Sequence, residues 1–130
     1  MGRIHQVIRY LLDTQIVLWA VEDSPRLPRR SRRILADGPR CYVSIASIWE
    51  MSINEGIGKL NVPADLLDRI ASVGATILPI TVGHARAVRD LPRHHNDPFD
   101  RMIVAQARME GLALISVDRE IARYDVDLIR

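Results

Sequence analysis

Short apolar runs alternate with amphipathic segments along most of the chain. The runs of strand-forming residues cover 7–12, 41–44, 76–79, 112–116 and 126–129. Between them, apolar residues recur every three or four positions, as on one buried helix face, over 15–21, 45–54, 64–72, 82–91 and 97–110. Strands that alternate with helices are typical of an α/β fold with a mainly parallel sheet covered by helices. We therefore expect a single domain over residues 7–130, preceded by a short N-terminal extension at 1–6.

The segment 45–54 combines an apolar stripe with an acid. Ser44 precedes it and can cap a helix. The positions that recur at helical spacing, and that we expect to face the core, are Ile45, Ile48, Trp49, Ser52 and Ile53. Glu50 lies between them, where an acid is either at the wet margin of the stripe or part of a site.

The segment Asp97–Ala107, DPFDRMIVAQA, has the signature of a helix N-terminus. Asp97 suits the N-cap, Pro98 the first helical position and Asp100 the third, while Gly111 can end the helix. Two acids here complement the helix dipole without any chemistry. This interpretation is sufficient for Asp97. For Asp100 a functional role stays open, because acids occupy comparable positions elsewhere.

Acids also follow two of the predicted strands. Asp13 comes directly after the strand at 7–12, and Asp118 lies just past the strand at 112–116. The carboxyl ends of parallel strands share one edge of the sheet, where open α/β sheets bind their ligands. With Asp100 and Glu50, four carboxylates from separated segments would converge there, and such a cluster repels itself unless a cation is present. Hard oxygen ligands suit Mg²⁺ or Mn²⁺, which can activate water against a phosphodiester. The alternative for Asp13 is a simple helix N-terminal acid.

Composition limits the class of protein. The chain has 130 residues, 48% of them hydrophobic, and no apolar run approaches the ~18 residues of a membrane-spanning helix. No signal-peptide pattern opens it. The single cysteine, Cys41, excludes an internal disulfide and is expected to be buried. We expect a cytoplasmic protein without a membrane partner.

Basic residues add a weaker indication. Lys59 is the only lysine among 18 basic residues, and arginine binds phosphate well, although a GC-rich genome explains the bias equally. The basic segment 24–38 is either a solvated face or a phosphate contact. Arg101 pairs with a carboxylate or contacts phosphate. The candidate contacts to a nucleic acid are Arg29, Arg30, Arg33 and Arg101. His94 and His95 lack metal-ligand spacing, and we expect them to be exposed in a loop.

Four motifs in this order are similar to those of a known family. They are LLDT (Leu11–Thr14), SIASIWE (Ser44–Glu50), NDPFDRMIVAQA (Asn96–Ala107) and ISVD (Ile115–Asp118). Together they resemble PIN-domain ribonucleases and, more narrowly, the VapC toxins of bacterial type II toxin–antitoxin pairs. The resemblance covers nearly the whole chain from residue 7.

The resemblance implies a PIN-like, three-layer α/β fold with a mainly parallel sheet of about five strands. It also implies a homodimeric endoribonuclease that needs Mg²⁺ or Mn²⁺, cleaves RNA and is held inactive by a VapB-type antitoxin. The catalytic, metal-binding acids of the family map onto Asp13, Glu50, Asp100 and Asp118. The supporting positions map onto Thr14, Ser116 and Asp97.

Other interpretations stay open. A phosphatase of the haloacid dehalogenase kind needs a second aspartate two residues after the first, where this chain has Gln15. A catalytically inactive PIN binding module would have lost some of the acids. A PIN nuclease of RNA processing, outside any toxin pair, is a further alternative. An antitoxin helix would need an apolar groove, for which the Trp19 side of the first helix and the region Ile48–Ile57 are the candidates, unless both fill the core.

Overall fold

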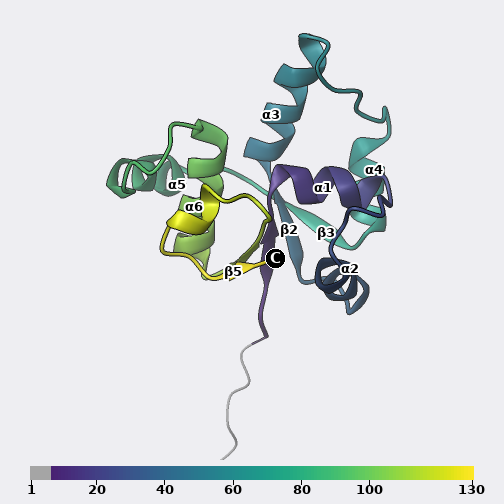
Figure 1. Cartoon of the computed structure of the whole chain (residues 1–130), viewed down its shortest axis with the longest axis horizontal. Coiled ribbons are helices and arrows are strands. Elements are labelled where there is room, and N and C mark those ends of the chain that lie inside the picture. The colour runs from purple at the N-terminus through teal and green to yellow at the C-terminus, as the bar shows by residue number, and fades with distance from the viewer. Residues whose placement is uncertain (1–6) are drawn as a thin grey trace, which may run out of the picture.

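Five short strands form a parallel sheet at the centre of the molecule, in the order β3-β2-β1-β4-β5 (Figure 1). The computed structural model describes residues 7–130, so the expected extension at 1–6 lies outside the described residues. The strands are β1 (Tyr10–Leu12), β2 (Cys41–Ser44), β3 (Ala75–Leu78), β4 (Ala113–Ile115) and β5 (Leu128–Ile129). Every neighbouring pair runs parallel, which confirms the predicted α/β fold.

Helices cover both faces of this sheet. They are α1 (Thr14–Val21), α2 (Arg29–Ala36), α3 (Ile45–Gly56), α4 (Leu66–Ser72), α5 (Val82–Ala87) and α6 (Pro98–Glu110). Two short 3₁₀ helices, η1 (Val88–Asp90) and η2 (Ile121–Arg123), follow α5 and β4. In Figure 1, α1, α2 and α4 lie on one side of the sheet and α5 and α6 on the other, while α3 projects beyond its edge. Within residues 7–130, no helix is long and apolar enough to span a bilayer.

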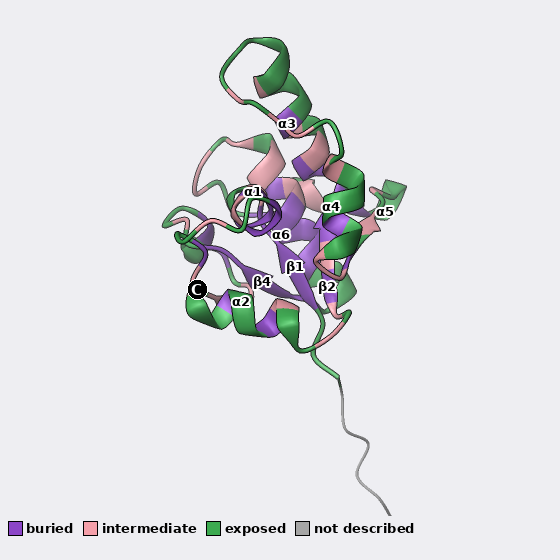
Figure 2. Cartoon of the chain, turned by 90° about the vertical axis from the view of Figure 1, so that its right-hand side faces the viewer, coloured by how far each residue is buried: buried purple, intermediate pink, exposed green. Residues whose placement is uncertain are grey.

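The core consists of two apolar clusters, one on each face of the sheet. Successive side chains of β1 alternate between them, as strand geometry requires: Leu12 packs with Ile16 of α1, whereas Leu11 packs with Ile103 of α6. All three residues of β1 and of β4 are buried, which explains their continuous apolar sequences (Figure 2). Cys41 is buried as predicted.

Several elements are shorter than the pattern predicted, namely β1, β4, β5, α4 and the helix expected over 82–91. β1 begins at Tyr10 because its partner strands begin opposite that residue, at Cys41 and Ala113. The preceding apolar residues are therefore exposed. The helix expected over 82–91 ends at Ala87 and continues only as η1, and Leu91 is extended because the following proline disfavours helical backbone before it.

The core face of α3 is not the predicted one. Its buried residues are Ala46, Ser47 and Met51, whereas Ile45, Trp49 and Ile53 are 39%, 57% and 42% exposed. The buried face of the helix contacts both clusters, since Ala46 belongs to one and Met51 to the other. Ile48 packs partly against the core. We call the exposed residues Ile45, Trp49, Ile53 and Ile57 the α3 stripe.

Candidate active site

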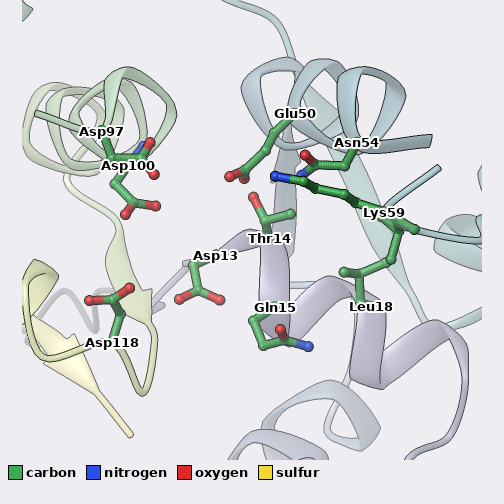
Figure 3. Close-up of a pocket in the computed structure, with 11 residues that line it drawn as sticks. Asp13, Thr14, Gln15, Leu18, Glu50, Asn54, Lys59, Asp97, Asp100 and Asp118 are labelled. Carbon is green, nitrogen blue, oxygen red and sulfur yellow. The ribbon is translucent and has the colours of Figure 1, made fainter. Parts of the chain in front are cut away.

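All four predicted acids line one cleft at the carboxyl edge of the sheet (Figure 3). The cleft has a volume of about 320 Å³. Its lining residues are Asp13, Thr14, Gln15, Leu18, Glu50, Asn54, Lys59, Leu60, Asp97, Asp100 and Asp118. They come from the start of α1, from α3 and the loop after it, from the start of α6, and from the loop after β4. The topology thus brings together acids that are far apart in the sequence, with Asp13 and Asp118 separated by 105 positions.

Asp13 is the most buried of these acids, at 4% exposure. It follows β1 and caps α1, because the N–H of Ile16 donates to its Oδ1 at 2.9 Å. The hydroxyl of Ser116 donates to its Oδ2 and accepts the N–H of Asp118 at 3.0 Å. Burial raises the pKa of Asp13 to about 6, although the hydrogen bonds that it accepts from Ser116 and from the Ile16 N–H oppose the rise. Ser116 therefore ties two of the acids together.

Asp97 and Asp100 occupy the first turn of α6. The Oδ1 of Asp97 accepts the N–H groups of Phe99 and Asp100 at 2.9 and 3.0 Å, which confirms the predicted N-cap. Asp100 points into the cleft. Burial, then repulsion from Asp97, raises its pKa to about 7, while a hydrogen bond from His95 opposes the rise.

Glu50 reaches the cleft from α3. Its Oε1 is buried and has no hydrogen-bond partner within residues 7–130. Burial is the main cause that raises the pKa of Glu50, and repulsion from Asp97 adds to the rise. Thr14 does not hold Asp13, since its hydroxyl donates to Ser47 at 2.9 Å. A buried carboxylate oxygen without a donor lacks the compensation that such a group normally has.

The donor set fits a hard divalent cation. The carboxylates of Asp13, Glu50, Asp100 and Asp118 offer only oxygen ligands, which Mg²⁺ and Mn²⁺ prefer. Within residues 7–130, no three His, Cys, Asp or Glu side chains already stand close enough to enclose an ion. Mg²⁺ does not need such a cage, because it keeps several waters and is usually bound through one or two carboxylates. The unpartnered oxygen of Glu50 and the raised pKa values indicate that positive charge is what the cleft lacks.

Arg101 does not have the expected partners. It is 9% exposed, and its guanidinium lies against backbone carbonyls rather than a carboxylate. Nη1 donates to the oxygen of Pro92 at 2.8 Å and to the hydroxyl of Tyr124 at 3.0 Å. Nη2 donates to the carbonyls of Val88 and Leu91 at 3.2 and 3.3 Å. These carbonyls belong to η1 and the loop after it, where a buried backbone needs donors from side chains.

The expectation of exposed histidines is wrong. His94 and His95 are both half-buried. The ring of His94 packs edge-on against Tyr124 at 4.8 Å, and Nδ1 of His95 lies 2.8 Å from the Tyr124 hydroxyl oxygen. Nε2 of His95 lies 3.2 Å from Oδ2 of Asp100. Nothing in the local sequence reveals this arrangement, because Tyr124 comes from a distant segment.

The arginines of α2 lie outside the cleft. Arg29, Arg30 and Arg33 are exposed and are not among its lining residues, so their contact with RNA stays a prediction. The basic residue that does line the cleft is Lys59, whose side chain points toward Glu50 (Figure 3). Sequence reasoning did not assign Lys59 to the site, although its place as the only lysine was visible.

Comparisons with known proteins agree with this fold. The sequence pattern of the PIN domain matches residues 10–127. A chain of VapBC2 from Rickettsia felis, solved with a DNA fragment from its promoter, aligns with a TM-score of 0.70 at 16% identity over 94% of this chain and 98% of that one. DNA-bound VapBC from Salmonella typhimurium aligns with a TM-score of 0.68 at 18% identity, over 95% of this chain and 98% of that one. FitAcB from Neisseria gonorrhoeae aligns with a TM-score of 0.63 at 20% identity, over 93% of this chain and 96% of that one.

No curated protein matches this sequence. At identities of 20% or less, the solved structures establish the shared fold. The domain match, by contrast, spans most of the chain and includes every acid that lines the cleft. This chain belongs to the PIN-domain family.

Proposed function

We propose that this protein is a metal-dependent endoribonuclease of the VapC type that a VapB-type antitoxin neutralises. The observation that carries the proposal is the convergence of Asp13, Glu50, Asp97, Asp100 and Asp118 on one cleft. PIN domains are in general nucleases, and the four acids that the resemblance assigns to the site all line this cleft. The convergence counts against an inactive PIN module, because a cluster of buried carboxylates destabilises a protein that does not use it.

The residues of the site divide into those that would hold the cation and those that orient them. Asp13, Asp100, Asp118 and Glu50 are the groups that would hold Mg²⁺ or Mn²⁺. Such a cation, when bound, lowers the pKa of its water and neutralises charge on the phosphodiester. Ser116 orients Asp13, and the Asp97 cap fixes the helix turn that presents Asp100.

RNA would approach the acids past Lys59. A phosphodiester entering an acidic cleft needs a cation on the substrate side, and the exposed ammonium of Lys59 is the basic group that lines this one. Leu18 and Leu60 supply apolar surface beside it, against which a base can pack. We expect Lys59→Gln to raise KM for RNA by about 3–10-fold with little change in kcat, because one phosphate contact is lost.

Cleavage of total bacterial RNA tests the activity. Purified, antitoxin-free protein is incubated with Mg²⁺ or Mn²⁺, with EDTA, and with a single-stranded DNA of matched sequence. Asp100→Asn is compared with Asp125→Asn, which removes an exposed acid outside the cleft. We expect discrete metal-dependent cuts in RNA that vanish in Asp100→Asn and persist in Asp125→Asn.

Other outcomes contradict the proposal at different points. Cutting that survives both EDTA and Asp100→Asn means that this site is not the catalytic one. Cutting of the DNA in place of RNA refutes the ribonuclease assignment. A folded protein that binds neither Mn²⁺ nor RNA favours the inactive module, and cleavage confined to one precursor RNA favours the RNA-processing alternative.

The proposed antitoxin would cover the cleft. The solved structures with this fold include VapBC and FitAcB assemblies. An antitoxin segment with a basic side chain among apolar ones would match five acids bordered by Leu18 and Leu60. The product of a short reading frame next to the gene is the partner to test. Co-expression should suppress RNA cleavage, and a stable complex without suppression contradicts this location.

The proposed homodimer would use the α3 stripe. Trp49 is 57% exposed and packs edge-on against Phe99 of α6 at 5.0 Å, so the apolar surface continues from one helix to the next. A second copy of the chain would bury this surface across a two-fold axis. Light scattering should give a dimer for the wild type and a monomer for Trp49→Lys. A monomeric wild type refutes this proposal.

A further inference from the structure

A chain of polar side chains runs from the buried guanidinium of Arg101 to the candidate site. Arg101 Nη1 donates to the Tyr124 hydroxyl at 3.0 Å, this hydroxyl lies 2.8 Å from His95 Nδ1, and His95 Nε2 lies 3.2 Å from Asp100 Oδ2. Tyr124 is buried, while the side chains of His95 and Asp100 are 14% and 15% exposed. The contacts connect the loop before α6, the segment after η2 and the first turn of α6.

Arg101 is the one fixed donor in this chain, and it suggests a direction for the hydrogen bonds that follow. The Tyr124 oxygen already accepts a proton from Arg101, which has donors only, so its own proton is free to go to His95 Nδ1. Nδ1 must then be the unprotonated ring nitrogen. The proton of a neutral His95 is therefore on Nε2, which faces the carboxylate of Asp100. In this arrangement the Tyr124 hydroxyl has an acceptor in Nδ1, and the Nε2 proton has an acceptor in the Asp100 carboxylate.

Arg101 gives the chain a rigid origin. Its other hydrogen bonds go to the carbonyls of Pro92, Val88 and Leu91, so turning the guanidinium would break three further contacts, and the one to Leu91 is buried. The ring of His94 packs against Tyr124 as well but makes no side-chain hydrogen bond to an acid within residues 7–130. Both histidine rings lie against Tyr124, but only His95 makes side-chain hydrogen bonds among the described residues, to the Tyr124 hydroxyl and to Asp100.

We propose that His95 is a positioning residue for Asp100: held by Tyr124 and Arg101, its Nε2–H fixes Oδ2 and would leave Oδ1 available to a cation bound in the cleft. This inference rests on the proposed function, because it assigns His95 to the metal site of that function. Ligands of metal ions commonly depend on such outer hydrogen bonds, and removal of one typically weakens metal binding by 10–100-fold.

The first test needs no metal. Nitrogen-15 NMR of the imidazole rings at about pH 8, above the usual pKa of histidine, identifies which nitrogen carries the proton. We expect the Nε2–H tautomer for His95, with a changed Nδ1 resonance in Tyr124→Phe and an unchanged spectrum in His94→Ala. An Nδ1–H tautomer for wild-type His95 overturns the proposed direction of the chain.

The second test measures Mn²⁺ affinity by calorimetry at the same pH. We expect His95→Leu to weaken binding 10–100-fold and Tyr124→Phe about 10-fold, with His95→Gln, whose amide can still donate to Asp100, within about threefold of wild type. His94→Ala is the matched control and should bind like wild type. Circular dichroism and the melting temperature show whether each variant is folded.

The outcomes separate this inference from the proposed function. If His95→Gln is as weak as His95→Leu, the ring acts through packing and the positioning role is wrong. If His95→Leu binds Mn²⁺ like wild type, the role is also wrong, even when the protein cleaves RNA. If wild type and Asp100→Asn bind Mn²⁺ equally, the metal site itself is wrong, while the tautomer of His95 still tests the hydrogen-bond chain.

Discussion

The candidate site should lower the stability of the metal-free protein, and Asp100 allows this to be measured. Its pKa is about 7 in the folded state against an ordinary value of 3.8, mainly because of burial and then because of Asp97. The folded protein therefore keeps a proton on Asp100 at pH values where the unfolded chain has released it. With this sign, the contribution of Asp100 to stability is most favourable below about pH 4, declines as the pH rises toward 7, and stays unfavourable above it.

The size of the effect follows from the same values. A pKa of about 7 instead of 3.8 corresponds to a loss of about 4 kcal/mol at neutral to alkaline pH. Asparagine has nearly the same shape, carries no charge, and its carbonyl can accept the hydrogen bond from His95. We therefore expect Asp100→Asn to stabilise the metal-free protein by about 2–4 kcal/mol at about pH 8, and by less than about 0.5 kcal/mol at about pH 4.

Urea unfolding in EDTA, followed by circular dichroism at several pH values, measures this difference. At an ordinary denaturant slope the midpoint should move by roughly 1–2 M urea at alkaline pH. Asp125→Asn, at an exposed position, is the control and should change the midpoint little. Adding Mn²⁺ should stabilise wild type more than Asp100→Asn. A gain that is absent at alkaline pH, or that is the same at both pH extremes, would falsify the assignment of a repelled, desolvated carboxylate.

Three further predictions concern residues around the site. Ser116→Ala removes the hydroxyl that donates to Asp13, so the pKa of Asp13 should rise above about 6. Calorimetry should then show Mn²⁺ affinity about 10-fold weaker at neutral pH and less affected at alkaline pH, and equal losses at both pH values would contradict this prediction. His84→Ala should destabilise by about 2–4 kcal/mol in urea, since the buried Gln106 amide loses an acceptor, and a change below about 1 kcal/mol refutes this. Gly111→Ala should cost about 1 kcal/mol, because this residue ends α6 at φ 65°, and an unchanged urea midpoint would argue against that strain.

The parts of the fold that sequence predicts well are those with local causes. The strands around Leu11 and Leu114 are continuous apolar runs because both faces of the sheet are covered, and this pattern is visible in the sequence. Asp97 caps α6 through its own neighbours, as its position next to Pro98 indicates. Asp13 and Asp118 were expected at one sheet edge because parallel strands end together, and β1 and β4 are adjacent.

The features that sequence does not reveal depend on distant contacts. The spacing of Ile45, Trp49 and Ile53 predicts an apolar face but not whether the core or a partner covers it, and here the core accepts the smaller Ala46 side instead. Arg101 follows Asp100 directly, yet its guanidinium binds carbonyls of a loop that only the tertiary fold brings near. The role of His95 depends in the same way on a tyrosine from another segment.

Because Asp13 also caps a helix, its mutation has a consequence for how this protein could evolve. One of its oxygens accepts the Ile16 N–H, and asparagine caps helices as well as aspartate does. The hydroxyl of Ser116 can rotate to accept from the new amide. Under the proposed function, a single Asp13→Asn change would therefore leave a descendant that folds and keeps its surfaces but has lost the proposed nuclease activity. Within such a lineage, the step from an enzyme to a silent binding protein replaces one oxygen with one nitrogen.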